Sequence, residues 1–148
     1  MDADSHGQHG EEPEWTSSPA WGARVEQLGL EFLAAFFAVD VQRHPDHLAS
    51  LVELGHVYTQ LGRYQEGLEI DQRLAEALPD DPTVHYNLAC SLALLGRGQE
   101  ALAALEWALG CGYGDVEFLL GDDDLASIRE EPRFQALVRE LLDRQQSD

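Results

Sequence analysis

A chain of 148 residues has room for one domain built around a single continuous core. Apolar residues make up 44% of it and charged residues 25%, which is ordinary globular usage, so most of the chain is expected to fold. The formal net charge is −19, and the nine basic residues are all Arg. Such a surface repels phosphate backbones and anionic lipid headgroups, which argues against nucleic acids and membranes as partners.

The first twenty residues, 1–20, are rich in Gly, Ser, His, Glu and Pro and are predicted to form a flexible acidic tail. They contain neither the basic nor the apolar region of a secretory signal, and the longest apolar run, Phe32–Val39, is too short to cross a membrane. We therefore expect a cytoplasmic protein in which Cys90 and Cys111 are buried thiols. Abundant Arg, Ala, Gly and Leu without Lys is typical of a GC-rich bacterial genome.

A first helix is predicted from Trp21 to about Gln42, because Pro45 prevents its continuation. Apolar residues at steps of three and four are expected to face the core: Val25, Leu28, Phe32, Phe36 and Val39. A second apolar stripe is expected on the surface as a possible second interface: Leu30, Leu33, Phe37 and Val41. This second stripe would bind a partner or a second copy of the chain, unless Trp15, Trp21 and the tail cover it.

The following segments repeat at an offset of 34 residues. The first copy reads Leu51-x2-Leu54-Gly55-x2-Tyr58 and then Leu61-Gly62-Arg63, and the second reads His85-x2-Leu88-Ala89-x2-Leu92 and then Leu95-Gly96-Arg97. Gly55 and Ala89 are small where a neighbouring helix has to approach closely. Gly62 and Gly96 are placed to end the first helix of each copy. Each copy is therefore predicted to be a helical hairpin.

Two hairpins follow from this pattern, with Asp81 and Pro82 as the start signal of the second one. Their expected helices are Leu48–Leu61 with Tyr64–Leu78, and Pro82–Leu95 with Gln99–Leu109. The period and the alternation of large and small residues resemble the tetratricopeptide repeat. Asp71 departs from that pattern, since it stands where the family carries a large apolar residue, and it predicts a locally shifted helix face.

The resemblance implies an all-α superhelix with two full repeats, at about 48–81 and 82–115, in a single domain over 21–148. A helix before the repeats and a C-terminal segment at 116–145 would close its two ends. The C-terminal segment resembles the one that closes many bacterial arrays, on the residues Gly112-x2-Asp115, Asp122-Asp123-Asp124-Leu125 and Pro132-Arg133-Phe134.

In this family the first helices of successive repeats line a concave groove that takes a peptide or a helix. Carried onto this chain by the repeat alignment, the groove residues are Val52, Glu53, His56, Thr59, Gln60, Thr83, Tyr86, Asn87 and Cys90. Family members that grip a partner's terminal carboxylate use Lys, Arg and Asn there, and only Asn87 is present here. An equal alternative for Tyr86 and Asn87 is that they serve packing and hydrogen bonding within the fold.

No residue pattern predicts catalysis, a cofactor or a metal. His44 and His47 are interpreted as surface histidines, and the run at 122–124 as helix-capping carboxylates because it lacks the spacing of a calcium loop. We therefore predict a non-catalytic adaptor or scaffold that binds another protein. The acidic charge serves solubility or steers a basic peptide or helix to the groove. A self-assembling subunit, for example a homodimer through the first helix, is the alternative.

Overall fold

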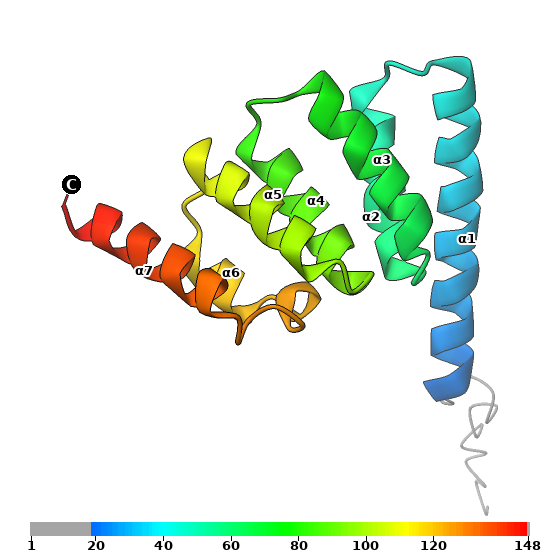
Figure 1. Cartoon of the computed structure of the whole chain (residues 1–148). Helices are drawn as coiled ribbons and strands as arrows, with labels where there is room; N and C mark the ends of the chain where they lie inside the picture. Colours follow the sequence, from blue (N-terminus) through cyan, green and yellow to red (C-terminus); the bar gives the residue numbers. More distant parts are fainter. Residues whose placement is uncertain (1–18, 148) are drawn as a thin grey trace, which may run out of the picture.

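A computed structural model of the chain describes residues 19–147, and these form helices without a strand. Their bounds are α1 Pro19–Arg43, α2 Leu48–Gln60, α3 Tyr64–Ala77, α4 Pro82–Leu94, α5 Gly98–Gly110, α6 Val116–Gly121, the 3-10 helix η2 Asp123–Leu125, and α7 Pro132–Gln146. The helices stack side by side from α1 at one edge to α7 at the other (Figure 1). The predicted all-α superhelix is confirmed, and the predicted helix bounds lie within two residues of those observed.

The 34-residue period extends further along the chain than the two predicted repeats. First helices begin at Leu48, Pro82 and Val116, and second helices begin at Tyr64, Gly98 and Pro132. The pair of α6 and α7 therefore occupies the place of a third repeat, with its first helix shortened. At the other end α1 stops at Arg43, which is 34 residues before the last residue of α3. The first helix thus takes the place of the second helix of a preceding repeat.

Local signals in the sequence set these bounds. Gly62 and Gly96 have φ of 71° and 73°, in the left-handed region that glycine adopts without steric cost. The amide of Arg63 then donates to the carbonyl of Tyr58 at 2.8 Å, which closes the end of α2 as predicted. At the start of α4 the Asp81 side chain accepts hydrogen bonds from the amides of the second and third helical residues, at 2.9 and 3.0 Å.

The two helices of the first hairpin are in close contact at Gly55. A Cβ atom on this residue would lie 3.2 Å from Asp71 Oδ1 and 3.3 Å from Ile70 Cγ2. The small residue predicted at this position therefore fits a tight contact between α2 and α3. Asp71 itself is only 6% exposed and accepts a hydrogen bond from Ser91. The prediction of a shifted helix face at Asp71 is wrong, because a polar pair has replaced the apolar contact without moving the helix.

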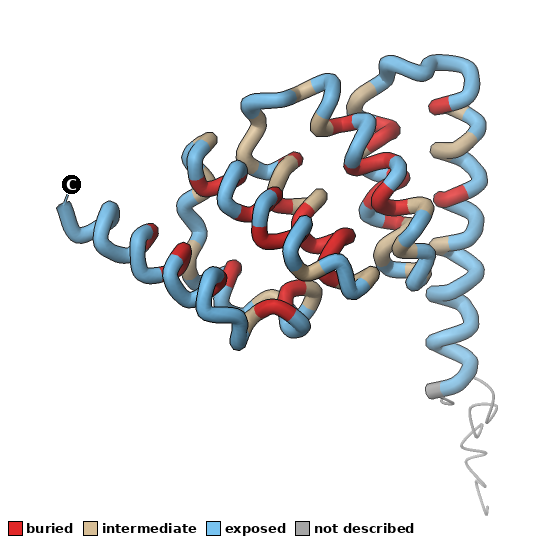
Figure 2. The backbone as a smooth tube through the Cα atoms, viewed as in Figure 1, coloured by how far each residue is buried: buried red, intermediate tan, exposed pale blue. Residues whose placement is uncertain are grey.

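The buried residues form two clusters, shown in red over the middle of the stack in Figure 2. The larger cluster joins α4 and α5 to the C-terminal segment, where Leu119, Leu125 and Phe134 are almost fully buried. The smaller one joins α1 to α2, α3 and the start of α4. None of the helices within 19–147 is both long enough and apolar enough to cross a bilayer.

The two apolar stripes of α1 face in directions opposite to those predicted. Of the stripe predicted to lie on the surface, Val41 is buried, Phe37 packs against the same cluster and Leu30 is half-buried, and Leu33 alone is exposed as predicted. The residues expected to point inward are all exposed. We call that exposed set the outer stripe: Val25, Leu28, Phe32, Phe36 and Val39. Both stripes have helical spacing, so periodicity alone could not decide between them. Small Ala34 and Ala38 on the side of Val41 allow α2 to approach there.

The start of α1 is exposed over its whole circumference, since every residue in 20–29 is exposed (Figure 2). In Figure 1 this part of α1 projects beyond the ends of α2 and α3. The predicted tail at 1–20 lies outside the described residues except for its last two, which begin α1. Trp15, predicted as one of the residues covering the helix, also lies outside them.

Candidate functional site: a pocket between the first helices

A pocket of about 260 Å³ lies where the first helices of the three successive units meet. Six of the predicted groove residues line it from α2 and α4, namely His56, Thr59, Gln60, Tyr86, Asn87 and Cys90. Three further residues come from the C-terminal segment, namely Phe118, Asp122 and Asp124. The lining combines three rings, two amides, a hydroxyl, a thiol and two carboxylates, which suits an amphipathic side chain better than a purely apolar one.

The other three predicted groove residues do not line this pocket. Val52 packs against the smaller core cluster, and Glu53 and Thr83 do not reach the pocket from their places on α2 and α4. The family pattern predicts groove positions on each first helix, but it does not distinguish which of them line a common pocket. The residues that do line the pocket lie in the C-terminal half of α2 and in the middle of α4.

The residues from the C-terminal segment were missed because that segment was interpreted only as a cap. The 34-residue offset contained the necessary signal, since Val116 stands 34 residues after Pro82 and begins a helix in the same way. Extending the repeat alignment by one unit would have placed Asp124 at the position equivalent to Cys90.

Tyr86 forms the wall of the pocket between α4 and the C-terminal segment. Its ring stacks on Tyr113 with 4.3 Å between centroids and an interplanar angle of 6°, and its hydroxyl donates to Asp122 Oδ2 at 2.7 Å. The side chain is only 3% exposed, and burial together with this hydrogen bond raises the pKa of Tyr86 above its usual value. Tyr86 is therefore held almost entirely by contacts within the fold, and little of it is open to a partner.

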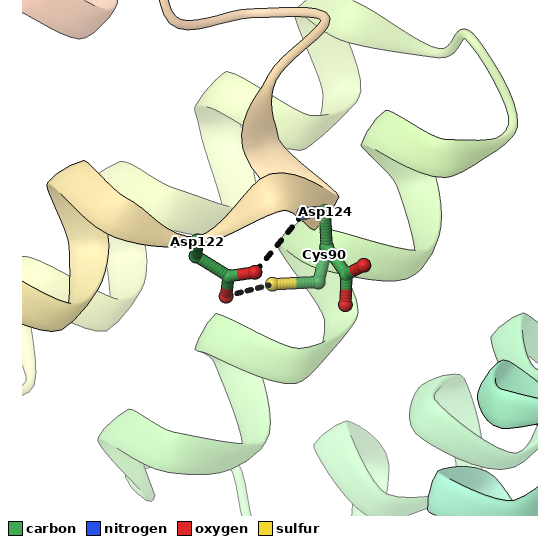
Figure 3. Close-up of side chains that lie close together, drawn as sticks. All are labelled: Cys90, Asp122 and Asp124. Carbon is green, nitrogen blue, oxygen red and sulfur yellow. Dashed lines mark hydrogen bonds between the residues drawn. The ribbon is translucent and has the colours of Figure 1, made fainter.

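Asp122 is the hub of the polar contacts under the pocket (Figure 3). Besides the tyrosine hydroxyl, its carboxylate accepts the amide of Asp124 at 3.0 Å and the thiol of Cys90 at 3.7 Å. Arg129 Nη2 also donates to the Asp122 backbone carbonyl at 2.8 Å. These bonds fasten the turn before η2 onto α4, so the predicted capping role of this acidic run is one part of a larger network.

Cys90, Asp122 and Asp124 bring three potential metal ligands together, with ligand atoms within 4.8 Å of one another, the one such group within 19–147 (Figure 3). The chemistry of the set favours a hydrogen-bond network over a metal centre. Metals bind the thiolate, and burial together with the charges of Asp122 and Asp124 raises the pKa of the Cys90 thiol. The Asp122 oxygens are also already occupied by donors from within the fold.

The negative charge of the site comes from the C-terminal segment. Partial burial, followed by the neighbouring charges of Asp122 and Asp123, raises the pKa of Asp124. On the far side of Phe118 a second hollow of about 600 Å³ is lined by Asp115, Glu117, Phe118, Gly121, Asp122 and Asp123. The two hollows share Phe118 and Asp122. Together they give the C-terminal side of the groove a carboxylate-rich surface around one exposed aromatic ring.

His44 and His47 do not come near this pocket. His47 Nδ1 lies 2.7 Å from Asp40 Oδ2, and the hydroxyl of Ser50 donates to the same oxygen at 2.5 Å. The Ser50 bond, with the His47 contact second, lowers the pKa of Asp40. The cluster joins the end of α1 to the start of α2, which is a structural role.

The chain matches no family model. It is 33% identical over 90 residues to a chloroplastic protein of Arabidopsis thaliana, a match that covers 59% of this chain and 27% of the plant protein. It is 30% identical over 95 residues to the peroxisomal targeting signal receptors of Komagataella phaffii (strain GS115 / ATCC 20864) and Komagataella pastoris, over 64% of this chain and 16% of each receptor. The chain therefore spans less than a third of the length of these curated relatives.

Among solved structures the chain is similar in fold to MamA MSR-1 C2, with a TM-score of 0.62 and 24% sequence identity. The similarity covers 83% of this chain and 73% of MamA, which is a tetratricopeptide-repeat protein. Paired helices at a constant period define the class, a helical-repeat solenoid of the kind that serves as a protein-interaction module. The fold and the sequence matches agree with the resemblance to the tetratricopeptide repeat.

Proposed function

We propose that this protein is a non-catalytic adaptor that binds a basic peptide or helix of another protein across the pocket between α2, α4 and α6. The observation that carries the proposal is the convergence of residues from three successive units on one pocket. Such convergence gives a ligand several simultaneous contacts on a rigid wall. The two similar Komagataella proteins are, by name, receptors of a targeting signal, which agrees with recognition of a segment of another protein.

The charge of the pocket supports a Lys or Arg side chain as the central contact. The raised pKa of Asp124 reflects burial and unfavourable interaction among neighbouring carboxylates, and a cation bound between them would relieve the repulsion. The aliphatic stem of the same side chain would lie along the exposed ring of Phe118. A partner's terminal carboxylate fits this site poorly, because Asn87 is its one amide on α4 and neither Lys nor Arg lines it.

Binding can be tested with a phage-displayed random peptide library on the immobilised full chain, followed by calorimetry with the selected peptides. We expect enrichment of Lys and Arg, and an affinity that falls as salt is added. Asp124→Asn together with Asn87→Ala is expected to weaken binding at least about tenfold, the loss of roughly one charged contact. Glu53→Gln removes the same charge from an exposed position on α2 outside the pocket and serves as the matched control.

Selection of acidic or purely apolar peptides would contradict the proposed basic partner. Equal binding by the pocket variant and by wild type would remove the pocket as the site. Tyr86 is avoided as a test position because its substitution would disturb the fold. A cytoplasmic location stays a prediction, since one of the relatives is chloroplastic.

A further inference from the structure

The outer stripe of α1 is an apolar surface that no other described helix covers. Its five members are between 46% and 69% exposed, with Phe32 the most exposed at 69%. Phe32 and Val41 are nine residues apart, which is about two and a half helical turns, so they lie on opposite sides of the helix. The side of Val41 already packs on the domain. The packing of residues 19–147 therefore accounts for one apolar face of α1 and leaves the outer stripe without a contact.

The spacing of the five residues Val25 to Val39 is symmetric about its centre, and exposed Trp21 extends the stripe by one further turn on one side. Its steps are three, four, four and three residues, centred on Phe32. This spacing suits an interface between two identical chains about a two-fold axis, because residue i of one chain then meets residue j of the other and residue j meets residue i. In an antiparallel pair of helices with the axis at Phe32, Val25 stands at the level of Val39 and Leu28 at the level of Phe36.

The charges of α1 also favour a second copy. The helix carries two basic and three acidic residues, namely Arg24, Arg43, Glu26, Glu31 and Asp40, while the whole chain has a net charge of −19. Two copies can therefore approach through this helix with little of the repulsion that opposes contact elsewhere. A basic partner finds little charge to bind here. An anionic bilayer needs a polar face rich in Lys and Arg, and α1 has no Lys and two Arg.

We propose that two copies of this chain associate through an antiparallel pair of α1 helices, with the two-fold axis at Phe32. Because α1 stands at the edge of the stack, a second chain can reach it without meeting α4 to α7 (Figure 1). The projecting segment 20–29 of one copy then packs on the anchored C-terminal half of the other. A short helical segment without tertiary contacts is marginal in water, so this contact stabilises the part of α1 that its own domain leaves bare.

Small residues beside the stripe allow close contact between the helices. Gly29 and Ala35 lie on either side of Phe32, and a Cβ at Gly29 would meet no atom within 4 Å. The pair is therefore free to pack at short interaxial distance. The surface is separate from the pocket between the first helices, so the dimer does not depend on the proposed adaptor function and leaves the groove open.

Sedimentation equilibrium of the full chain over a range of concentrations tests the association. Wild type is expected to approach the mass of two chains as concentration rises. Phe32→Glu places like charges against each other at the axis and is expected to raise the dissociation constant at least about 100-fold. Ala23→Glu adds the same charge at an exposed position nine residues from Phe32, on the opposite side of the same helix, and should leave the dimer intact. A wild-type chain that stays monomeric, or a dimer that Phe32→Glu does not weaken, overturns the proposal.

Cysteine pairing tests the direction of the helices, in a Cys111→Ser background. Chains carrying Val25→Cys mixed with chains carrying Val39→Cys are expected to form a disulfide on mild oxidation, whereas Val25→Cys alone is not. Disulfide formation by Val25→Cys with itself would overturn the antiparallel arrangement. Binding of a monomeric chain to phosphatidylcholine vesicles, lost in Phe32→Glu, would replace the second copy by a lipid surface.

Discussion

Ser91 on α4 donates a hydrogen bond of 2.5 Å to Asp71 Oδ2 on α3, and both side chains are buried between the two repeats. Burial raises the pKa of Asp71 from 3.8 to about 6, against the opposing effects of the Ser91 hydrogen bond and the charge of His56. A polar pair thus replaces the large apolar side chain that the repeat pattern favours at this position. Its ionisation is linked to the stability of the junction between repeats.

The first prediction concerns the pH dependence of Asp71→Asn. A carboxyl whose pKa is higher in the folded state holds its proton longer there, so the free energy of unfolding contributed by this group falls as pH rises from about 4 to about 6. The loss at pH 7 amounts to at most about 3 kcal/mol. Asparagine does not titrate, so the stability of the variant relative to wild type is expected to increase over this range.

Urea unfolding of both proteins at pH 4, 5, 6 and 7, followed by circular dichroism, measures this difference. Other titrating groups contribute to both proteins and cancel in the comparison. If the stability of Asp71→Asn relative to wild type stays constant with pH, or increases as the pH falls, then ionisation of Asp71 costs nothing in the folded protein.

The second prediction concerns Ser91→Ala. This change leaves the buried carboxylate of Asp71 without its side-chain donor, and it is expected to cost about 1 to 3 kcal/mol at pH 7. In an Asp71→Leu background, which restores the residue type typical of the repeat, the same change should cost almost nothing because no carboxylate is left unpaired.

Denaturant unfolding of the four chains of this cycle gives the coupling between the two residues. Ser127→Ala is the matched control, since its hydroxyl donates to the neutral carbonyl of Ala93 at 3.0 Å and should cost only about 0.5 to 1.5 kcal/mol. An equal cost of Ser91→Ala in both backgrounds would mean that the bond to Asp71 contributes nothing.

The architecture could be read from the sequence because its signals are local and repeated. Gly62, Gly96 and Asp81 each fix a helix end by backbone geometry or a hydrogen bond to a nearby amide, and the 34-residue period copies those ends along the chain. Such features depend on neighbours in sequence. The helix bounds were accordingly predicted to within two residues.

The choice of which face of α1 is buried, and the set of residues that line the pocket, depend on contacts between segments distant in sequence. The stripe that contains Val41 and the stripe that contains Phe32 both have helical spacing. Only the approach of α2 to the side of Ala34 and Ala38 decides which stripe is buried. Similarly, Asp122 reaches Tyr86 across 36 residues through a turn whose path no local pattern specified. For this reason the pocket residues on α2 and α4 were predicted from the sequence, whereas those on the C-terminal segment were not.

The third prediction compares two glycines. Gly62→Ala forces a side chain into the left-handed region at φ of 71° and is expected to cost about 1 to 2 kcal/mol. Gly110→Ala, at the end of α5, has helical geometry and no atom within 4 Å of the added Cβ, so it should be neutral or stabilising by up to about 1 kcal/mol. Melting temperatures of the two variants test the contrast, and equal shifts would contradict the role of Gly62 in ending α2.

The fourth prediction separates the two contacts of Tyr86. Tyr86→Phe keeps the ring stacked on Tyr113 and removes the hydroxyl that donates to Asp122. Because Asp122 keeps the Asp124 amide and the Cys90 thiol as donors, we expect a loss of about 1 to 2 kcal/mol, whereas Tyr86→Ala removes the buried ring as well and should cost about 3 to 5 kcal/mol.

The same pair of variants reports on how the C-terminal segment is held. Tyr86→Phe loosens the turn at Asp122, so Cys90 below it should react faster with a thiol reagent under native conditions, while the partly exposed Cys111 keeps its rate. Faster reaction of Cys90 in step with the loss of stability indicates that this segment opens locally, as the final unit of a repeat array does. An unchanged rate for Cys90 would place the anchor of the segment in its apolar contacts, with Leu119, Leu125 and Phe134 holding it in place without the tyrosine bond.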